Sequence, residues 1–386
     1  MRIALAIALA LAVSSPALAD ETPIRVAILR HQPVAVVSSE GGLTVRKPDQ
    51  AEGSPYVAPS VSTALDIRPI PNGLLLAGAI EAGDTLALVP AEPLPISVNG
   101  HFYRGSVIIQ NDGDGTLDVI NVVDLEQYLY GVVGSEMDPG WPAAALQAQA
   151  IVARTYAVAH LGTRDWLGYD LRAGEQDQAY LGMQAEAPAS IAAVKATRGS
   201  VLVYGPDLVH AYYSSCDGGF TSDGSALSDP QPYLSPIADP YCRASPDEHW
   251  AADVPLSTFA AAFAARYGDV GAIRAIDPGA ADASGRLLTV TIRGAAGDRS
   301  IPATEFRALA GNHDVRSTLI SSISVQDDTL HVEGSGFGHG VGMSQWGART
   351  MALDGKSAQE ILRFYYKGVE FAQIADELKR QYGADP

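Results

Sequence analysis

The stretch from Trp141 to Gly162 constrains the fold of this chain more than any other part of it. Pro142 stands where the first turn of a helix tolerates proline, and Gly162 is a suitable stop at the far end. Between them Ala, Leu, Ile and Val occupy nearly every side of the predicted helix, which is typical of a helix buried all round. Its polar residues need partners, because an unpaired buried polar group is costly. They are Gln147, Gln149, Arg154 and Thr155. The chain must therefore build sheets or further helices around this segment.

The part of the chain ahead of this helix is predicted to be β-rich, from Ile24 to Val133. Short runs of Val, Ile and Leu are separated there by turn signals such as Gly41-Gly42 and Asn111-Asp112-Gly113. The stretch from Lys47 to Ser60, rich in Pro, Gly, Ser and charges, is expected to be a mobile loop. The later part mixes helices and strands. The predicted fold class is therefore α+β, with a mixed β-rich body around the buried Ala-rich helix.

Local patterns predict further elements after residue 162. Ser357 followed by Glu360 is a capping box, which opens a helix, and Gly205-Pro206-Asp207 predicts a hairpin. Residues 246–330 carry elements of their own and are interpreted as an accessory α/β insertion. The expected helices are 188–198, 256–267, 304–310, 344–353 and the one opened by Ser357, and the expected strands include 287–292 and a glycine-rich strand over 334–342.

The first residues predict export. Arg2 precedes an apolar run through Val13, and Ala17-Leu18-Ala19 supplies a small-x-small cleavage pattern, so residues 1–19 are typical of a secretory signal peptide. The alternative is an uncleaved anchor, although the run is short for a spanning helix. No later segment has the length of a transmembrane span. We therefore expect the protein in the periplasm or elsewhere in the cell envelope.

The net charge of the chain limits the classes of partner that it can bind. A formal net charge of −18 opposes binding to nucleic acid, whose phosphates would be repelled. No basic stripe for a membrane surface is present in the sequence. A neutral or weakly charged polymer is the better partner.

Glu136 is the clearest candidate for acid–base chemistry. It stands between Ser135 and Met137, just ahead of the buried helix that carries Arg154. Apolar neighbours such as Met137 and Trp141 would desolvate its charged form and raise its pKa toward a value useful for a general acid. The alternative is an ordinary loop glutamate paired with Arg154. The residues alone leave both interpretations open.

A second candidate is the glycine-rich run from Gly334 to Gly347. Glycine at every second position predicts a strand with one bare face, which a backbone or a sugar ring could approach closely, while His339 lies on the other face. The run does not match the dinucleotide pattern G-x-G-x-x-G, and Gly342 to Gly347 is one residue too long for the serine elbow. A strand pressed against a helix for packing alone remains the alternative.

The two cysteines, Cys216 and Cys242, favour a disulfide, because an exported chain leaves the reducing cytosol. No metal site is predicted. The alternative is zinc held by His210, Cys216 and Cys242, with His249 as a further candidate, although none of the spacings is the tight C-x-x-C kind. No cofactor is therefore expected beyond this zinc alternative.

Several motifs occur in an order that resembles the SpoIID/LytB family. The resemblance extends from about Ile24 to Gly368 and is weakest before Val107 and across the insertion. The motifs are Val123-Asp124-Leu125-Glu126-Gln127-Tyr128-Leu129, Glu136-Met137, Trp141-Pro142, the run 145–156, Gln178-Ala179-Tyr180-Leu181-Gly182, Tyr213-Ser214-Ser215, Gly218-Gly219-Phe220-Thr221, the run 336–348 and Tyr365-Tyr366-Lys367-Gly368. The resemblance gives the domain plan: signal peptide 1–19, N-terminal β-rich part 20–106, SpoIID/LytB-like catalytic domain 107–368 with its insertion at about 246–330, and C-terminal tail 369–386.

The resemblance also implies a function. Proteins similar to SpoIID are lytic transglycosylases that cut peptidoglycan glycan strands stripped of their peptides, whereas the LytB branch is described as an enhancer of a cell-wall amidase. The expected partners are thus glycan strands and a cell-wall amidase. A glycan-binding module without catalysis and a zinc hydrolase are the rival interpretations. The catalytic glutamate of the family falls on Glu136, and the substrate-binding candidates at motif positions are Arg154, Tyr156, Ser214, Thr221, His339, Ser344 and Gln345.

Overall fold

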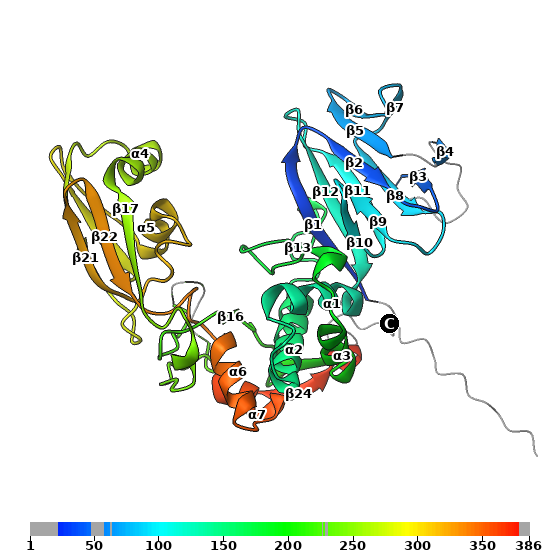
Figure 1. The fold of residues 1–386 in the computed structure, drawn as a ribbon. Coiled ribbons are helices and arrows are strands. Elements are labelled where there is room, and N and C mark those ends of the chain that lie inside the picture. Colours follow the sequence, from blue (N-terminus) through cyan, green and yellow to red (C-terminus); the bar gives the residue numbers. More distant parts are fainter. Residues whose placement is uncertain (1–21, 48–57, 62–63, 226, 228–230, 378–386) are drawn as a thin grey trace, which may run out of the picture.

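The structure is a computed structural model that describes residues 22–47, 58–61, 64–225, 227 and 231–377. The predicted signal peptide and most of the predicted loop from Lys47 to Ser60 lie outside these residues. The chain has an α+β fold, as predicted, with a β-rich part, a helical part and a lobe of its own (Figure 1). Within the described ranges, no helix is both long and apolar enough to cross a bilayer.

The β-rich part consists of a seven-stranded and a six-stranded sheet. Their inward-facing Val, Ile and Leu side chains join one hydrophobic core with the helices. The larger sheet runs β13-β1-β12-β11-β8-β3-β4, and its strands are β13 (Leu171–Arg172), β1 (Pro23–Gln32), β12 (Leu117–Asp124), β11 (Ser106–Asn111), β8 (Thr85–Pro90), β3 (Leu43–Arg46) and β4 (Ala58–Val61). The smaller sheet runs β10-β9-β2-β5-β6-β7, with β10 (His101–Tyr103), β9 (Ile96–Val98), β2 (Ala35–Ser38), β5 (Leu65–Ile70), β6 (Gly73–Leu76) and β7 (Ile80–Ala82). Because β8 pairs with β11 and β1 pairs with β12, strands on both sides of residue 106 belong to one sheet.

The helical part is centred on α2 (Ala143–Ala159), the buried helix that the sequence predicts. It contacts α1 (Leu125–Glu136), α3 (Pro188–Ala196), α6 (Gln345–Leu353) and α7 (Ala358–Tyr365), and from Ala145 to Val158 only Gln147 is not buried. Helix α7 has the predicted capping box of Ser357 and Glu360. The prediction of β structure as far as Val133 is wrong, because α1 begins at Leu125 with Asp124 as its N-cap, accepting a hydrogen bond from the Gln127 amide.

A small sheet closes the helical part. β14 (Ser200–Tyr204) and β15 (Asp207–Leu208) form the predicted hairpin, and β24 (Glu370–Gln373) pairs with β14 on its other side. Residues 370–373 are therefore a sheet strand and not the tail that the sequence predicts. Short 3-10 helices occur at Asp165–Leu167, Gly182–Ala185 and Cys242–Ala244.

The lobe has a hydrophobic core of its own, which includes Phe259, Phe263 and Phe306. It contains two three-stranded sheets and two helices, and Figure 1 shows it apart from the β-rich part. The chain enters through β17 and leaves through β22, which pair from Trp250 with Gly334 onward. Its elements are β17 (Trp250–Pro255), α4 (Leu256–Tyr267), β18 (Ile273–Pro278), β19 (Thr289–Gly294), β20 (Asp298–Pro302), α5 (Ala303–Ala310), β21 (Ile320–Gln326) and β22 (Thr329–Gly334). The predicted helices at 256–267 and 304–310 are confirmed.

The glycine-rich segment after β22 is not the long strand that the sequence predicts. Gly336, Gly338, Gly340 and Gly342 have φ values of +78°, +102°, +70° and +72°, a region that other residues rarely adopt. An alternating positive φ breaks the strand. Phe337 and Val341 form isolated bridges with Cys216 and Ser222, and β23 (Met343–Ser344) pairs in parallel with β16 (Tyr213–Ser214). The glycines thus let the backbone turn repeatedly as it passes from the lobe to α6.

Candidate active site

Glu136 is the last residue of α1, and its carboxylate lies at the meeting point of three segments. The Ala179 amide and the Tyr213 hydroxyl donate to Oε1 at 2.7 Å and 3.0 Å, and the Gln345 side-chain amide donates to Oε2 at 3.3 Å. Burial raises the pKa of Glu136, and these three hydrogen bonds oppose the rise. The result is a carboxyl group whose pKa lies above its ordinary value, which is the direction that a general acid requires.

Pairing between β16 and β23 brings two of these donors together. Tyr213 is the first residue of β16, and Gln345 opens α6 directly after β23. Gln178 then orients the Tyr213 hydroxyl by donating to it at 3.1 Å. The side-chain Oε1 of Gln178 accepts from the fully buried Tyr128 hydroxyl, also at 3.1 Å. The Tyr213 hydroxyl thus accepts from an amide and can donate only toward Glu136 or the site.

Tyr213, Gln178 and Ala179 were not among the site residues predicted from the sequence. All three lie inside the motifs quoted above, 178–182 and 213–215. The signal was therefore present, but a tyrosine and a backbone amide give no spacing pattern that marks them as partners of Glu136.

Arg154 does not reach Glu136. Its guanidinium is fully buried and makes a two-pronged ion pair with Glu126, with Nε and Nη2 each 2.8 Å from a carboxylate oxygen. It also donates to the carbonyls of Ser200 and Val194. Arg154 therefore ties α2 to α1, α3 and β14, and the pairing with Glu136 that the sequence left open is not formed. Its predicted role in binding substrate stays a prediction.

The other predicted substrate-binding residues mostly hold the backbone or a neighbouring side chain. The Ser214 hydroxyl accepts from the Gly340 amide, and the Thr221 hydroxyl accepts from the Ile237 amide. Ser344 caps α6 by accepting from the Gly347 amide, and the buried Tyr156 donates to Asp177 at 3.0 Å. Of the predicted set, only Gln345 is hydrogen-bonded to Glu136.

His339 lies on the glycine-rich segment, and its ring faces the edge of Tyr212 with centroids 6.0 Å apart. Its Nδ1 accepts from the Val341 amide at 2.9 Å. Burial, with the charges of Arg286 and Arg307 from the lobe, lowers the pKa of His339 to about 4. The ring is therefore neutral near pH 7 and suited to hydrogen bonding with uncharged groups.

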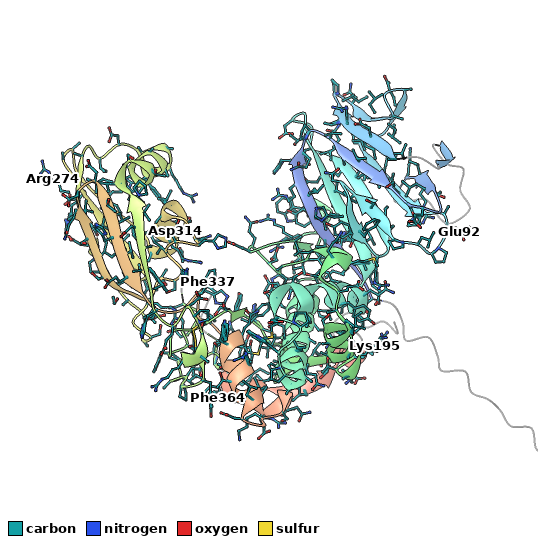
Figure 2. The ribbon with its side chains drawn as sticks, viewed as in Figure 1. Glu92, Lys195, Arg274, Asp314, Phe337 and Phe364 are labelled. Atoms are coloured by element: carbon teal, nitrogen blue, oxygen red, sulfur yellow. A yellow bond between two sulfur atoms is a disulfide. The ribbon has the colours of Figure 1, made fainter. Side chains whose placement is uncertain are left out.

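The lobe approaches the site at a second point besides its β17–β22 connection. In the turn after α5, His313 Nε2 lies 3.4 Å from Glu175, and the Asn312 amide donates to the same carboxylate. Glu175 precedes the segment whose Ala179 amide binds Glu136. The His313 ring also contacts Phe337, which Figure 2 shows between the lobe and the helical part.

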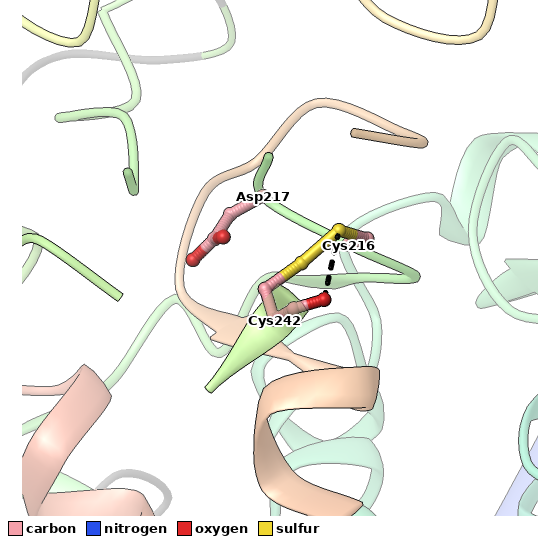
Figure 3. A group of neighbouring side chains, drawn as sticks. All are labelled: Cys216, Asp217 and Cys242. Atoms are coloured by element: carbon pink, nitrogen blue, oxygen red, sulfur yellow. Dashed lines mark hydrogen bonds between the residues drawn. A yellow bond between two sulfur atoms is a disulfide. The ribbon is translucent and has the colours of Figure 1, made fainter. Parts of the chain in front are cut away.

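The cysteines form a disulfide in the structure, between Cys216 and Cys242 (Figure 3). Zinc binds thiolates, and a disulfide offers none. Among the described residues, the ligand-type side chains gathered near these sulfurs are those of Cys216, Asp217 and Cys242, without His210, which is exposed. The residues present in this oxidised form therefore do not fit the predicted zinc alternative.

Asp217, beside the disulfide, is buried next to a second buried carboxyl group, that of Asp239. Burial and the charge of Asp239 raise the pKa of Asp217 to about 8. Its Oδ1 accepts from the Gly219 amide at 2.9 Å, and Tyr365 donates to Asp239 at 2.8 Å. The arrangement favours one shared proton between the two acids.

We expect Asp217→Asn to weaken the dependence of stability on pH. From the usual aspartate pKa to about 8, the folded carboxyl keeps a proton that the unfolded one has lost, so the free energy of unfolding falls as pH rises. The slope from this group is at most about 1.4 kcal/mol per pH unit. Asn keeps the acceptor for Gly219 and does not ionise. Melting curves of both proteins between about pH 5 and pH 9 test this, and curves that stay parallel would contradict it.

We expect Tyr213→Phe to raise the pKa of Glu136. The variant loses a donor to Glu136, so the pKa of that carboxyl rises further. If protonated Glu136 carries the activity, the alkaline limb of the pH–rate profile shifts to higher pH. The lost hydroxyl should also lower the free energy of unfolding by about 1 kcal/mol. Tyr212→Phe, one residue away, is the matched control and should leave the limb in place.

Comparisons with known proteins identify relatives of this chain. The family model described as stage II sporulation protein (SpoIID) matches residues 113–204, which include Glu136, Gln178 and Ala179. Stage II sporulation protein D of Bacillus subtilis is 30% identical over 68% of this chain and 78% of its own length. An uncharacterized protein of Brachyspira hyodysenteriae is 34% identical over 71% of this chain and 73% of its own. The amidase enhancer of Bacillus subtilis is 27% identical over 62% of this chain and 39% of its own.

Together the family model and these relatives define a protein of the class named for stage II of sporulation. The chain belongs to the family of stage II sporulation protein D, the SpoIID/LytB family.

Proposed function

We propose that the protein is a lytic transglycosylase that cleaves the bond between N-acetylmuramic acid and N-acetylglucosamine in peptidoglycan glycan strands. The observation that carries the proposal is the environment of Glu136. Its carboxyl is desolvated, and its hydrogen-bond partners are an amide, a hydroxyl and a carboxamide, all uncharged. Within the described part of the chain, no neighbouring charge contributes to the shift of its pKa.

This environment supports a mechanism with one carboxyl group. Protonated Glu136 gives its proton to the glycosidic oxygen as the bond from C1 of the muramic acid breaks. The resulting carboxylate takes the proton of the C6 hydroxyl of the same sugar, whose oxygen bonds to C1. The products are a 1,6-anhydro sugar and a free hydroxyl on the glucosamine, and Glu136 has its proton again. Since the substrate supplies the nucleophile, the second carboxylate of most glycosidases is not needed.

The surrounding residues support each stage. Tyr213 and the Ala179 amide stabilise the carboxylate formed after proton transfer, and Gln345 fixes its other oxygen. The neutral His339 is suited to binding an acetamido or hydroxyl group, and Trp141 to stacking on a sugar face. Such a substrate also places the protein in the cell envelope, as the predicted signal peptide requires.

A second function is favoured by one observation, the similarity to a protein named amidase enhancer. In that function the protein grips glycan strands and stimulates a cell-wall amidase without cutting them. Mass spectrometry of purified strands, with and without stem peptides, separates the two after incubation with the protein. Anhydro-muramyl ends support the transglycosylase. Intact strands that co-sediment with the protein support the binding module.

A further inference from the structure

Arg349 occupies an unusual position between two tryptophans. Its guanidinium carbon lies 5.7 Å from the ring centre of Trp141 and 5.2 Å from that of Trp346. The two indoles are themselves 5.0 Å apart and tilted by 60°. All three side chains are partly exposed, so this cluster forms a surface that a ligand can reach.

Apart from its contacts with the two indoles, the Arg349 guanidinium has no charged partner among the described residues. Across the described residues, the structure gives it no ion pair and no hydrogen bond, and its Nε is buried without a partner. Two other partly buried arginines of this acidic chain pair with carboxylates, Arg104 with Glu186 and Arg164 with Asp177. A guanidinium held on aromatic faces with its donors free is suited to a planar anion.

The cluster is connected to Glu136 through α6, which carries Trp346, Arg349 and Gln345. Arg349 follows Gln345 by one helical turn on the same face, about 6 Å along the axis. Long side chains on a helix lean toward its N-terminus, so Arg349 leans back toward Gln345, whose amide binds Glu136. Trp141 closes the turn after α1, with its amide bonded to the Asp138 carbonyl at 3.0 Å.

We propose that Arg349, Trp141 and Trp346 form a subsite for a sugar that carries a free carboxylate, the lactyl group of a peptide-free N-acetylmuramic acid. The proposal rests on the proposed function and names the chemistry that its substrate must show. The indoles stack on the sugar ring, and the guanidinium makes paired hydrogen bonds to the carboxylate.

This chemistry distinguishes bare from peptide-bearing strands. A stem peptide converts the lactyl carboxylate into a neutral amide, which has a single acceptor oxygen and no charge. The Arg349 guanidinium then has no anionic partner, yet the bound ligand still excludes water from it, so the cost of desolvation is not offset. With a net charge of −18 on the chain, a bare and therefore anionic strand also needs a specific cation at its binding site.

The test compares dissociation constants for short strands with free lactyl carboxylates and for the same strands methyl-esterified. Binding is measured by calorimetry on the full chain carrying Glu136→Gln, which prevents cleavage. We expect the free acid to bind at least about tenfold more tightly than the ester. Adding Arg349→Gln should remove this ratio, and Arg349→Lys should keep part of it because the charge remains. Arg363→Gln, an exposed arginine stacked on Phe371, is the control and should keep the full ratio.

Equal binding of acid and ester by the parent protein, or an unchanged ratio in Arg349→Gln, would overturn the subsite whether or not every variant folds. Cleavage by the wild type is scored separately, by anhydro ends. Tighter binding of the free acid without cleavage would contradict the transglycosylase and still support the subsite. Cleavage by a protein that binds acid and ester equally would support the transglycosylase and contradict the subsite.

Discussion

Glu136→Gln is expected to lose glycan cleavage by about 10³-fold or more, because the same carboxyl serves as acid and then as base. The fold should not suffer. Gln has the shape of Glu and keeps an oxygen for the donors at Ala179 and Tyr213. Rotation of the Gln345 amide would let its oxygen accept from the new side chain. Since burial disfavours the ionised carboxyl, removing it should leave the melting temperature equal or higher.

The measurement is the rate of appearance of anhydro-muramyl ends by mass spectrometry, with melting temperature recorded alongside. Asp138→Asn is the matched control, since Asp138 is an exposed carboxylate two residues on that accepts from the Gly140 amide, and Asn keeps that acceptor. The control should cut at the wild-type rate. Full cleavage by Glu136→Gln would remove the mechanism, and stimulation of an amidase that survives in this variant would favour the binding module.

Elements whose reasons are local could be predicted from the sequence. The helix from Ala143 to Ala159 follows from its composition and its Pro142 start, and α7 follows from the Ser357 capping box. Glu136 was predicted because a glutamate among apolar residues falls at the position of a family motif, and its catalytic role stays a prediction. Its pKa direction agrees with that expectation.

Elements that depend on tertiary packing could not be predicted from the sequence. Helix α1 contains Gly131 and Gly134, which disfavour a helix, yet a Cβ at Gly134 would lie 1.9 Å from the Ala185 carbonyl oxygen. The glycines are there so that the 3-10 helix at 182–185 can pack closely. The glycine-rich run misled in another way, because alternating glycines indicate a bare strand face equally well as alternating positive φ.

Arg154 shows the same limit at the level of one side chain. The sequence offers it Glu126 and Glu136, both on α1, and nothing in the spacing separates them. The position of each glutamate along α1 determines which of them pairs with Arg154. Glu126, in the first turn, faces α2 and also accepts from the Gly199 amide at 3.1 Å. Glu136, at the last position, turns toward Tyr213.

Arg154→Ala is accordingly expected to lower the free energy of unfolding by about 3–5 kcal/mol, the usual effect of leaving one partner of a buried ion pair alone. Glu126→Ala should cost a similar amount, since it strands the guanidinium. The double variant Glu126→Leu, Arg154→Met should be destabilised by much less than the sum of the single changes, because no charge is left unpaired. Chemical denaturation of these three proteins, together with the single variants Glu126→Leu and Arg154→Met that complete the double-mutant cycle, measures the coupling.

The activity of the folded fraction of Arg154→Ala distinguishes this structural role from a catalytic one. If Arg154 only joins α1, α2, α3 and β14, the pH–rate profile of Arg154→Ala at low temperature keeps its limbs at the wild-type positions, because no charge near Glu136 has changed. A shifted limb with an intact fold would instead show that the guanidinium acts on Glu136 through the length of α1. Thr155→Val is a suitable comparison, since it also removes buried hydrogen bonds of α2, to Ile151 and Leu202, without touching a charge.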